Sequence, residues 1–234
     1  MQSLIAAIRY LTVWGRLVSA QPISEPVGAL AAYFPLVGLI LGLILALLNY
    51  ALSLYVEVQL LSIFLIGFLM LATGAAHCDG VKNTFNALLA NRVDENSRET
   101  IFGSAVVFLL ILLKIRAVEV IDDKIILSLL LTPALARWTL VIFIFGYSEN
   151  CEETTRRIAE NLRFWHVLVT TIAILALGVI SFGRRGLWLG LCLSVVALLL
   201  RGWLHRRHAV LTQDDFGAII ELSETLCFVL LALF

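Results

Sequence analysis

The sequence predicts an all-α protein, a polytopic integral membrane helical bundle with about seven transmembrane helices plus an N-terminal amphipathic helix. Of its 234 residues, 61% are hydrophobic, whereas soluble domains are nearer ~45–50%. Mean hydropathy is +0.97, and apolar runs of the ~20 residues needed to cross a bilayer recur along the chain. We therefore expect residues 1–234 to form a single integral membrane domain in the lipid bilayer.

Charge and cysteine usage exclude several function classes. The net charge is zero, so we expect no nucleic-acid binding through a basic surface. The four cysteines are scattered without a CxxC pair, which supports neither a disulfide framework nor a zinc site. The first twenty residues mix Arg9 and Arg16 with apolar residues at helical spacing. This pattern indicates an amphipathic helix on the membrane instead of a cleavable signal.

The first two spans are expected at Val27 to about Tyr55 and at about Val58 to Ala76. Gly38 and Gly42 form a GxxxG pair in the first span. Such pairs allow helix backbones to approach closely in membranes. We therefore expect the first span to pack tightly against another helix.

The third and fourth spans, about Ile101 to Ile121 and about Ile125 to Tyr147, contain charged residues. Lys114 and Arg116 lie near the far end of the third span, where we expect them to snorkel to the surface. Arg137 follows Pro133 in the fourth span and lies too deep to snorkel. It is expected to face the bundle interior, where it could meet an anion.

Three further spans complete the bundle: about Phe164 to Phe182, about Leu187 to Leu204, and about Phe216 to Phe234. A tight turn, Gly183-Arg184-Arg185-Gly186, joins the first two, and a re-entrant pair is the alternative there. The last span carries Glu221 and Glu224. A purely structural membrane helix would not choose two carboxylates.

Three polar intervals separate these spans, and all three are expected on the cytoplasmic side. They are Thr73 to Gly103, Ser148 to Arg163, and His205 to Asp215, the second of them a solvated helical loop of mixed charge. Ten Lys and Arg residues fall on this side, in agreement with the positive-inside rule. The far side has Lys124, Arg184 and Arg185, and the Arg184-Arg185 pair is the exception to the rule.

The first polar interval carries the candidate chemistry. A helix beginning at Asp79 places Asp79, Asn83 and Asn86 at i, i+4 and i+7, on one face. Oxygen ligands in a row suit a hard cation such as Mg²⁺ that brings a phosphate substrate to the membrane surface. His77 lies one step before this face.

Five segments match, in order, the motifs of one known family. They are Tyr33 to Gly42 (FPLVG(L/I)xxG), His77 to Ala87 (HxDG continuing as DGLADTxDA), Asn96 to Gly103 (DSRIGxFG), Pro133 with Arg137 ((S/T)PxxxRW) and Thr212 to Glu221 (TGDxxGAxxE). Over essentially its whole length the chain resembles the cobalamin synthase family, adenosylcobinamide-GDP ribazoletransferase. It departs from the pattern at Asn83, Asn86 and Asn96, where the family has aspartate. Each change keeps an oxygen acceptor and removes a negative charge, which Asp94, Glu95 or Glu99 would have to replace.

The resemblance implies a phosphoryl-type transfer at a cytoplasmic active face of a bacterial or archaeal inner membrane. Its substrates are a corrinoid nucleotide, adenosylcobinamide-GDP, and alpha-ribazole or its 5'-phosphate. GMP leaves, and Mg²⁺ is the cofactor. The resemblance leaves open whether the protein forms a homo-oligomer.

Carried over by motif, the site residues fall into three groups. The metal ligands are Asp79, Asn83, Asn86 and Asp214. The catalytic residues are His77 as the base, Arg98, Arg137, and Glu221 from the opposite wall. Substrate binding is assigned to Arg98, Arg137 and Thr212.

Other functions remain open at this stage. One alternative is a catalytically degenerate paralogue that binds corrinoid or scaffolds pathway enzymes. Others are a different membrane phosphotransferase or a transporter. Against a transporter stand the lack of an evident internal repeat and the gathering of polar residues on one face, since carriers bind near the midplane.

Overall fold

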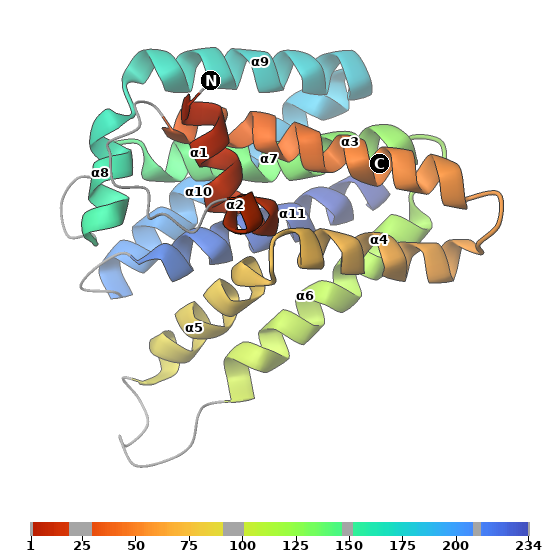
Figure 1. The fold of residues 1–234 in the computed structure, drawn as a ribbon, viewed down its shortest axis with the longest axis horizontal. Coiled ribbons are helices and arrows are strands. Elements are labelled where there is room, and N and C mark those ends of the chain that lie inside the picture. Colours follow the sequence, from red (N-terminus) through yellow and green to blue (C-terminus); the bar gives the residue numbers. More distant parts are fainter. Residues whose placement is uncertain (1, 19–29, 91–100, 147–151, 208–211, 234) are drawn as a thin grey trace.

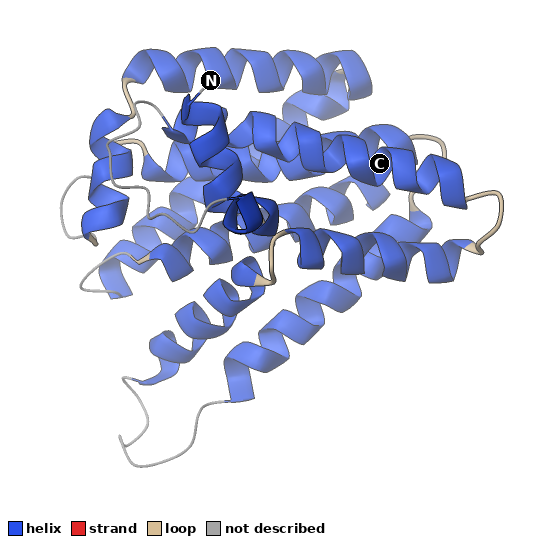
Figure 2. Ribbon diagram, in the orientation of Figure 1, coloured by secondary structure: helices blue, strands red, loops and turns tan. Residues whose placement is uncertain are grey.

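The structure, a computed structural model, describes residues 2–18, 30–90, 101–146, 152–207 and 212–233. Within these ranges the chain is helical and has no strand (Figure 2). The elements are α1 (Gln2–Leu11), α2 (Val13–Val18), the 3-10 helix η1 (Leu30–Tyr33), α3 (Phe34–Leu52), α4 (Val58–Ala72), α5 (Ala76–Ala90), α6 (Ile101–Val120), α7 (Ile125–Ile144), α8 (Glu153–Asn161), α9 (Phe164–Phe182), α10 (Arg184–Arg207) and α11 (Gln213–Leu233). The all-α prediction is confirmed.

In the described ranges, six helical segments are long and apolar enough to cross a membrane: η1 with α3, then α6, α7, α9, α10 and α11. Helices α4 and α5 together pass the same test as one crossing bent by 82°. This agrees with the predicted membrane bundle of about seven spans. Helices α9 and α10 each qualify as a candidate span on either side of Gly183 (φ 61°), and α10 begins at Arg184 instead of Leu187.

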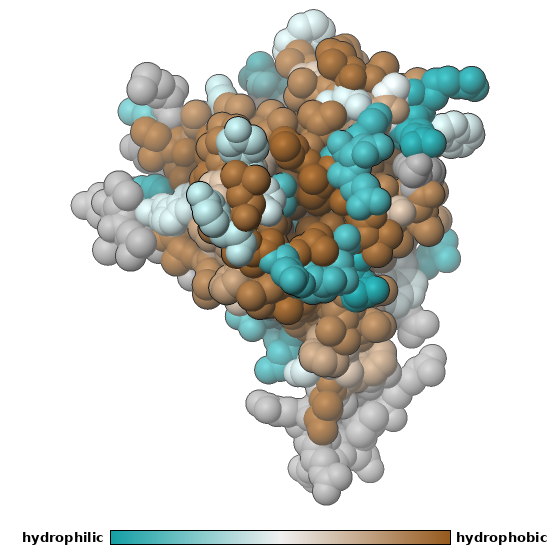
Figure 3. All heavy atoms as spheres, turned by 90° about the vertical axis from the view of Figure 1, so that its right-hand side faces the viewer, coloured by the Kyte–Doolittle hydropathy of each residue, from teal (hydrophilic) through white to brown (hydrophobic). Residues whose placement is uncertain are grey.

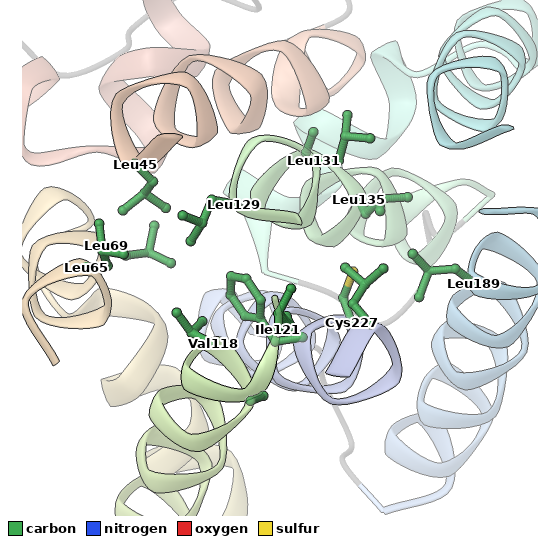
Figure 4. Packing of buried hydrophobic residues seen from close by; sticks show 14 of the residues in the cluster. Leu45, Leu65, Leu69, Val118, Ile121, Leu129, Leu131, Leu135, Leu189 and Cys227 are labelled. Atoms are coloured by element: carbon green, nitrogen blue, oxygen red, sulfur yellow. The ribbon is translucent and has the colours of Figure 1, made fainter. Parts of the chain in front are cut away.

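Helix α7 is the centre of the bundle. Each of its residues from 131 to 141 is buried, and α3, α9, α10 and α11 pack around it (Figure 1). Figure 4 shows Leu129 of α7 directed toward Leu45 of α3 and Leu69 of α4, while Leu135 faces the Cys227 side of α11. The core is therefore assembled from helices far apart in the sequence.

The two glycines of the GxxxG pair lie at the contact between α3 and α7. A Cβ atom added at Gly38 would lie 2.4 Å from the carbonyl oxygen of Pro133, and one at Gly42 would lie 2.0 Å from that of Leu130. No side chain larger than hydrogen fits at these distances. The predicted close packing is confirmed, and its partner is the central helix.

Helix α4 is shorter than the span expected at 58–76, because it ends at Ala72. Its 15 residues extend ~22 Å at 1.5 Å per residue, short of the ~30 Å hydrocarbon core. Gly74 and Ala75 then adopt positive φ angles of 64° and 55°, which are incompatible with continuing a right-handed helix. The resulting bend directs α5 away from the α4 axis and against α11.

The N-terminal amphipathic segment forms α1 and α2, and part of its apolar face is used inside the protein. Ala6, Ala7 and Leu11 are buried, and the Tyr10 ring stacks on Phe34 with centroids 5.6 Å apart. Burial raises the pKa of Tyr10. The helix is therefore docked on η1 and α3, where the sequence had suggested a helix lying on the membrane alone.

The prediction that Lys114 snorkels is wrong. Its side chain is 2% exposed, and Nζ lies 2.6 Å from Glu221 Oε1 and 2.8 Å from Glu224 Oε2. Arg137, fully buried as expected, also pairs with Glu224. Two carboxylates three residues apart on α11 thus neutralise two cations from α6 and α7, which removes the cost of burying any one of them alone. Arg116 is exposed, as expected.

The described part of the second polar interval is the short helix α8, with the mixed charge expected of a solvated segment. Glu153 pairs with Arg156 and Arg157 on its exposed face. The hydrogen bond from Arg157 holds the pKa of Glu153 below its usual value. Ile158 and Ala159 on the other face are buried, so α8 packs against the bundle through one side.

Candidate active site

A polar cleft of about 530 Å³ opens where the first turns of α5 and α11 meet α1 and α7. It is lined by Arg9, Tyr10, Leu11, Gly74, Ala76, His77, Asp79, Asn83, Leu140, Gln213, Asp214, Phe216, Gly217 and Ile220. The polar side chains come mainly from α5 and the start of α11. Both carboxylates that the sequence assigned to a cation, Asp79 and Asp214, line this one cleft.

Close helix packing produces this arrangement. A Cβ atom added at Gly80 would lie 2.5 Å from the carbonyl oxygen of Asp214 and 2.9 Å from the Cα atom of Gly217. The α5 and α11 backbones therefore touch at Gly80. Because Asp79 and Asn83 flank this contact on α5, they are brought beside Asp214.

We expect Gly80→Ala to push α5 and α11 apart, since the atoms it meets belong to rigid backbone. Overpacking of this kind costs about 1–3 kcal/mol, and the cleft should lose its geometry as well. Thermal unfolding in detergent would measure the loss of stability, and assays of the transfer reaction that the resemblance implies would measure the loss of geometry. Gly67→Ala on α4, where no atom lies within 4 Å of the added Cβ, is the matched control, and equal behaviour of the two variants would contradict the packing argument.

Two neighbouring carboxylates at the start of α11 have different surroundings. Asp214 is partly exposed, and its Oδ2 accepts a hydrogen bond of 3.0 Å from Asn83 Nδ2. Asp215 is fully buried: Oδ1 accepts from the Thr84 hydroxyl at 3.1 Å, and Oδ2 accepts from the Thr212 backbone N–H at 2.9 Å. Asp215 thus fixes the start of α11 to α5, while Asp214 and the exposed Asp79 remain open to the cleft.

Several predicted site residues lie elsewhere. Asn86 Oδ1 accepts a 2.8 Å hydrogen bond from the backbone N–H of Gly103, which ties α5 to the first turn of α6. Thr212 binds Asp215, as described above. Glu221 is held by Lys114 in the buried ion-pair network and does not line the cleft, which corrects its expected place on the opposite wall. Arg98, with Asp94, Glu95, Asn96 and Glu99, lies outside the described residues.

His77 connects the buried network to the cleft. It is 7% exposed and lines the cleft, and its Nε2 lies 3.4 Å from Arg137 Nη2. A guanidinium group can only donate hydrogen bonds, so Nε2 must carry the lone pair and Nδ1 the proton. Nδ1 has no hydrogen-bond partner among the described residues. This geometry favours His77 as an N–H donor, whereas the resemblance implied a general base.

The sequence pattern does not predict that Arg9 and Tyr10 line the cleft. Helical periodicity identifies the amphipathic character of the first helix, but it does not say which partner covers that helix. The structure places Arg9 and Tyr10 on the cleft wall. Arg9 adds a cation to a site whose nearest other charges are carboxylates.

In the described part of the chain, no group of three or more His, Cys, Asp or Glu side chains is arranged to hold a metal ion. A cage made of protein ligands alone is therefore not present there. Mg²⁺ commonly binds through one or two carboxylates together with waters and substrate phosphates. Asp79 and Asp214 fit that mode.

The family model described as "Cobalamin-5-phosphate synthase" matches residues 3–232. The chain belongs to this family. The match reaches from α1 to α11 and includes the residues of both the cleft and the buried network.

Individual relatives are similar to this chain over most or all of their length. A protein of Geotalea daltonii named adenosylcobinamide-GDP ribazoletransferase is 28% identical over 229 residues, 94% of this chain and 93% of its own. Proteins of the same name from Thermoanaerobacter pseudethanolicus (29% identical, 87% of both chains) and from a Pseudomonas fluorescens strain (29%, 100% of both) also match. No solved structure matches the chain significantly.

Proposed function

We propose that this member of the family joins adenosylcobinamide-GDP to alpha-ribazole or its 5'-phosphate, with release of GMP, in the polar cleft. The observation that carries the proposal is the meeting of Asp79, Asn83 and Asp214, from helices far apart in the sequence, at one cleft in the bundle. Such a cleft suits a reaction of a polar, diphosphate-bearing substrate in a membrane protein. Relatives of this chain are named adenosylcobinamide-GDP ribazoletransferase, after this reaction.

Mg²⁺ is the proposed cofactor, held by Asp79 and Asp214 together with the substrate diphosphate. The bound cation would neutralise the charge that develops on the diphosphate as GMP leaves. Asn83 orients the Asp214 carboxylate through its 3.0 Å hydrogen bond. Arg9 is positioned to contact a phosphate oxygen from the α1 wall.

The cleft is proposed to face the cytoplasm of a bacterial or archaeal cell. Arg9, Lys82, Arg156, Arg163 and Arg206 all belong to the helix ends or segments on the cleft side. Positive charge of this kind marks the cytoplasmic side.

A catalytically degenerate paralogue is not favoured. The chain retains two carboxylates open to the cleft, and it retains four buried charges behind it. Charged residues inside a membrane protein are costly, at ~2.5–3.5 kcal/mol each on insertion scales. Their retention is expected where a site depends on them.

Purified protein should make the cobamide product from adenosylcobinamide-GDP and alpha-ribazole, and removal of Mg²⁺ with a chelator should stop the reaction. Asn83→Asp removes the hydrogen bond to Asp214, but a third carboxylate strengthens the attraction to a dication, and we expect a net increase in the affinity for Mg²⁺ on the order of tenfold. Product formation measured against Mg²⁺ concentration tests both statements. Turnover that persists without divalent cations would overturn the assignment of the cofactor.

His77→Ala should lower kcat by about tenfold to a hundredfold, the worth of a hydrogen bond to a charged group. His77→Gln should recover part of this loss, because its side-chain amide can also donate an N–H. The pH dependence of kcat/KM separates the two roles. If His77 acts as a base, kcat/KM of the native protein falls at acidic pH, and this acidic limb disappears in both variants. If His77 acts as an N–H donor held by Arg137, the native protein and His77→Gln show the same pH profile of kcat/KM.

A further inference from the structure

Three side chains in a row connect the buried ion-pair network to the wall of the polar cleft. Glu224 of α11 pairs with Arg137 of α7, and Arg137 Nη2 lies 3.4 Å from Nε2 of His77 on α5. On the face shown in Figure 3 the exterior is largely hydrophobic, with polar side chains gathered in patches. Glu224 and Arg137 belong to no such patch, because both are fully buried. His77 is the member of the row that lines the cleft.

Glu224 is the carboxylate that both buried cations share. Its Oε1 accepts a hydrogen bond from Arg137 Nη1, and its Oε2 accepts one from Lys114 Nζ at 2.8 Å. Arg137 Nη1 also donates to the carbonyl oxygen of Pro133 at 3.0 Å, one turn earlier on α7. Because a guanidinium group is planar and rigid, these two contacts of Nη1 also fix the position of Nη2. The acceptor that Nη2 then meets is His77 Nε2.

Glu221 has a different place in the same network. It lies three residues before Glu224 on α11 and is also buried. Within the described residues, however, its carboxylate pairs with Lys114 and not with Arg137. The family motif at the start of α11 ends at Glu221 and gives no role to Glu224. The carboxylate that acts directly on Arg137 is therefore the one that the motif leaves out.

We propose that Glu224 is a positioning residue for the transfer reaction and acts on His77 through Arg137. The tautomer of a histidine is determined by the hydrogen bond that one of its ring nitrogens makes. With Arg137 Nη2 held against Nε2, the proton of the imidazole lies on Nδ1. The other tautomer would place an N–H group against the N–H groups of the guanidinium, and a buried donor without an acceptor is costly. Glu224 thus selects the nitrogen from which His77 donates to a substrate in the cleft.

Two double variants test this role, and each removes one cation and one carboxylate from the network. Lys114→Met with Glu224→Met leaves Arg137 without its ion-pair partner. Lys114→Met with Glu221→Met keeps the pair of Arg137 and Glu224 and is the matched control. The two proteins have the same composition and the same net charge. They differ only in which glutamate of α11 remains.

Nitrogen-15 NMR of histidine-labelled protein in detergent micelles at neutral pH distinguishes a protonated from an unprotonated ring nitrogen. The chain has four histidines, and the signals of His77 are those that His77→Gln lacks. In the native protein and in the control, Nε2 should be unprotonated and Nδ1 protonated. In Lys114→Met with Glu224→Met, both tautomers should be populated. A protonated Nε2 in the native protein, or the native spectrum in this variant, would overturn the proposal.

A double-mutant cycle on kcat tests the link to catalysis, and this part rests on the function proposed above. Lys114→Met with Glu224→Met should have a kcat about tenfold lower than the control, with little change in KM. Adding His77→Ala to both proteins should abolish this difference, because no imidazole remains to be positioned. A difference that persists without His77 would show that Glu224 serves only the fold and would overturn the positioning role. The NMR measurement needs no turnover, so a native protein that makes no product would contradict the proposed function and leave the tautomer test intact.

Discussion

Asp79→Asn is expected to lower kcat/KM by at least about a hundredfold, the scale on which loss of one charge-stabilising group acts in a transition state. The variant keeps the size of the side chain and removes only its negative charge. Asp79 is exposed in the cleft and has no hydrogen bond to another described side chain. The fold should therefore be unaffected, and the loss should appear in catalysis.

Steady-state assays at several Mg²⁺ concentrations would measure this effect, and thermal unfolding would confirm that the variant is folded. Glu57→Gln is a suitable control, because Glu57 is exposed at the start of α4, away from the cleft. Native rates for Asp79→Asn would remove Asp79 from the cation site. The assignment would then have to rest on Asp214 alone.

Lys114→Met should reduce stability by about 3–5 kcal/mol, the usual cost of removing one partner from a buried ion pair. The substitution leaves Glu221 and Glu224 buried with Arg137 as their one remaining cation in the network. Adding Glu221→Gln restores neutrality, because Arg137 and Glu224 still pair. The double variant should regain most of the lost stability.

Denaturant unfolding in detergent micelles would compare native protein, both single variants and the double variant as a thermodynamic cycle. Strong positive coupling between Lys114 and Glu221 is the expected result. Additive losses would show that the two side chains act independently, against the 2.6 Å contact between them. Because Arg137 also contacts His77, the single variant should lose activity as well.

Much of the fold could be predicted because membrane spans are determined by local hydropathy. The close approach of Gly38 and Gly42 to another helix also followed from their spacing. The fate of Lys114 could not be predicted in this way, because it depends on Glu221 and Glu224 arriving from a helix more than a hundred residues later. Local hydropathy does not indicate which residues of distant helices meet in the folded bundle.

The site was predicted in part. Family motifs assigned Asp79 and Asp214 to one cation, and both line the same cleft. Helical periodicity placed Asn83 on the face of Asp79, and Asn83 also lines the cleft. Periodicity also placed Asn86 on the same face, but Asn86 lies two turns after Asp79, beside the start of α6, where its Oδ1 accepts a hydrogen bond from the Gly103 backbone N–H. Arg9 was missed because an amphipathic helix can be covered by lipid or by protein, and only packing distinguishes the two.

For a reaction in the polar cleft, as proposed above, the bend between α4 and α5 would set the depth in the bilayer. With the start of α4 taken at the far surface, its ~22 Å before Gly74 leave ~8 Å of a ~30 Å hydrocarbon layer beyond this part of the cleft. Gly74, Ala76 and His77 line this part of the cleft. We therefore expect the diphosphate to be drawn below the level of the lipid head groups, where bulk water is scarce and hydrolysis cannot compete with transfer. The large corrinoid ring can meanwhile remain at the surface, so the enzyme needs to immerse only the reacting end of its substrate.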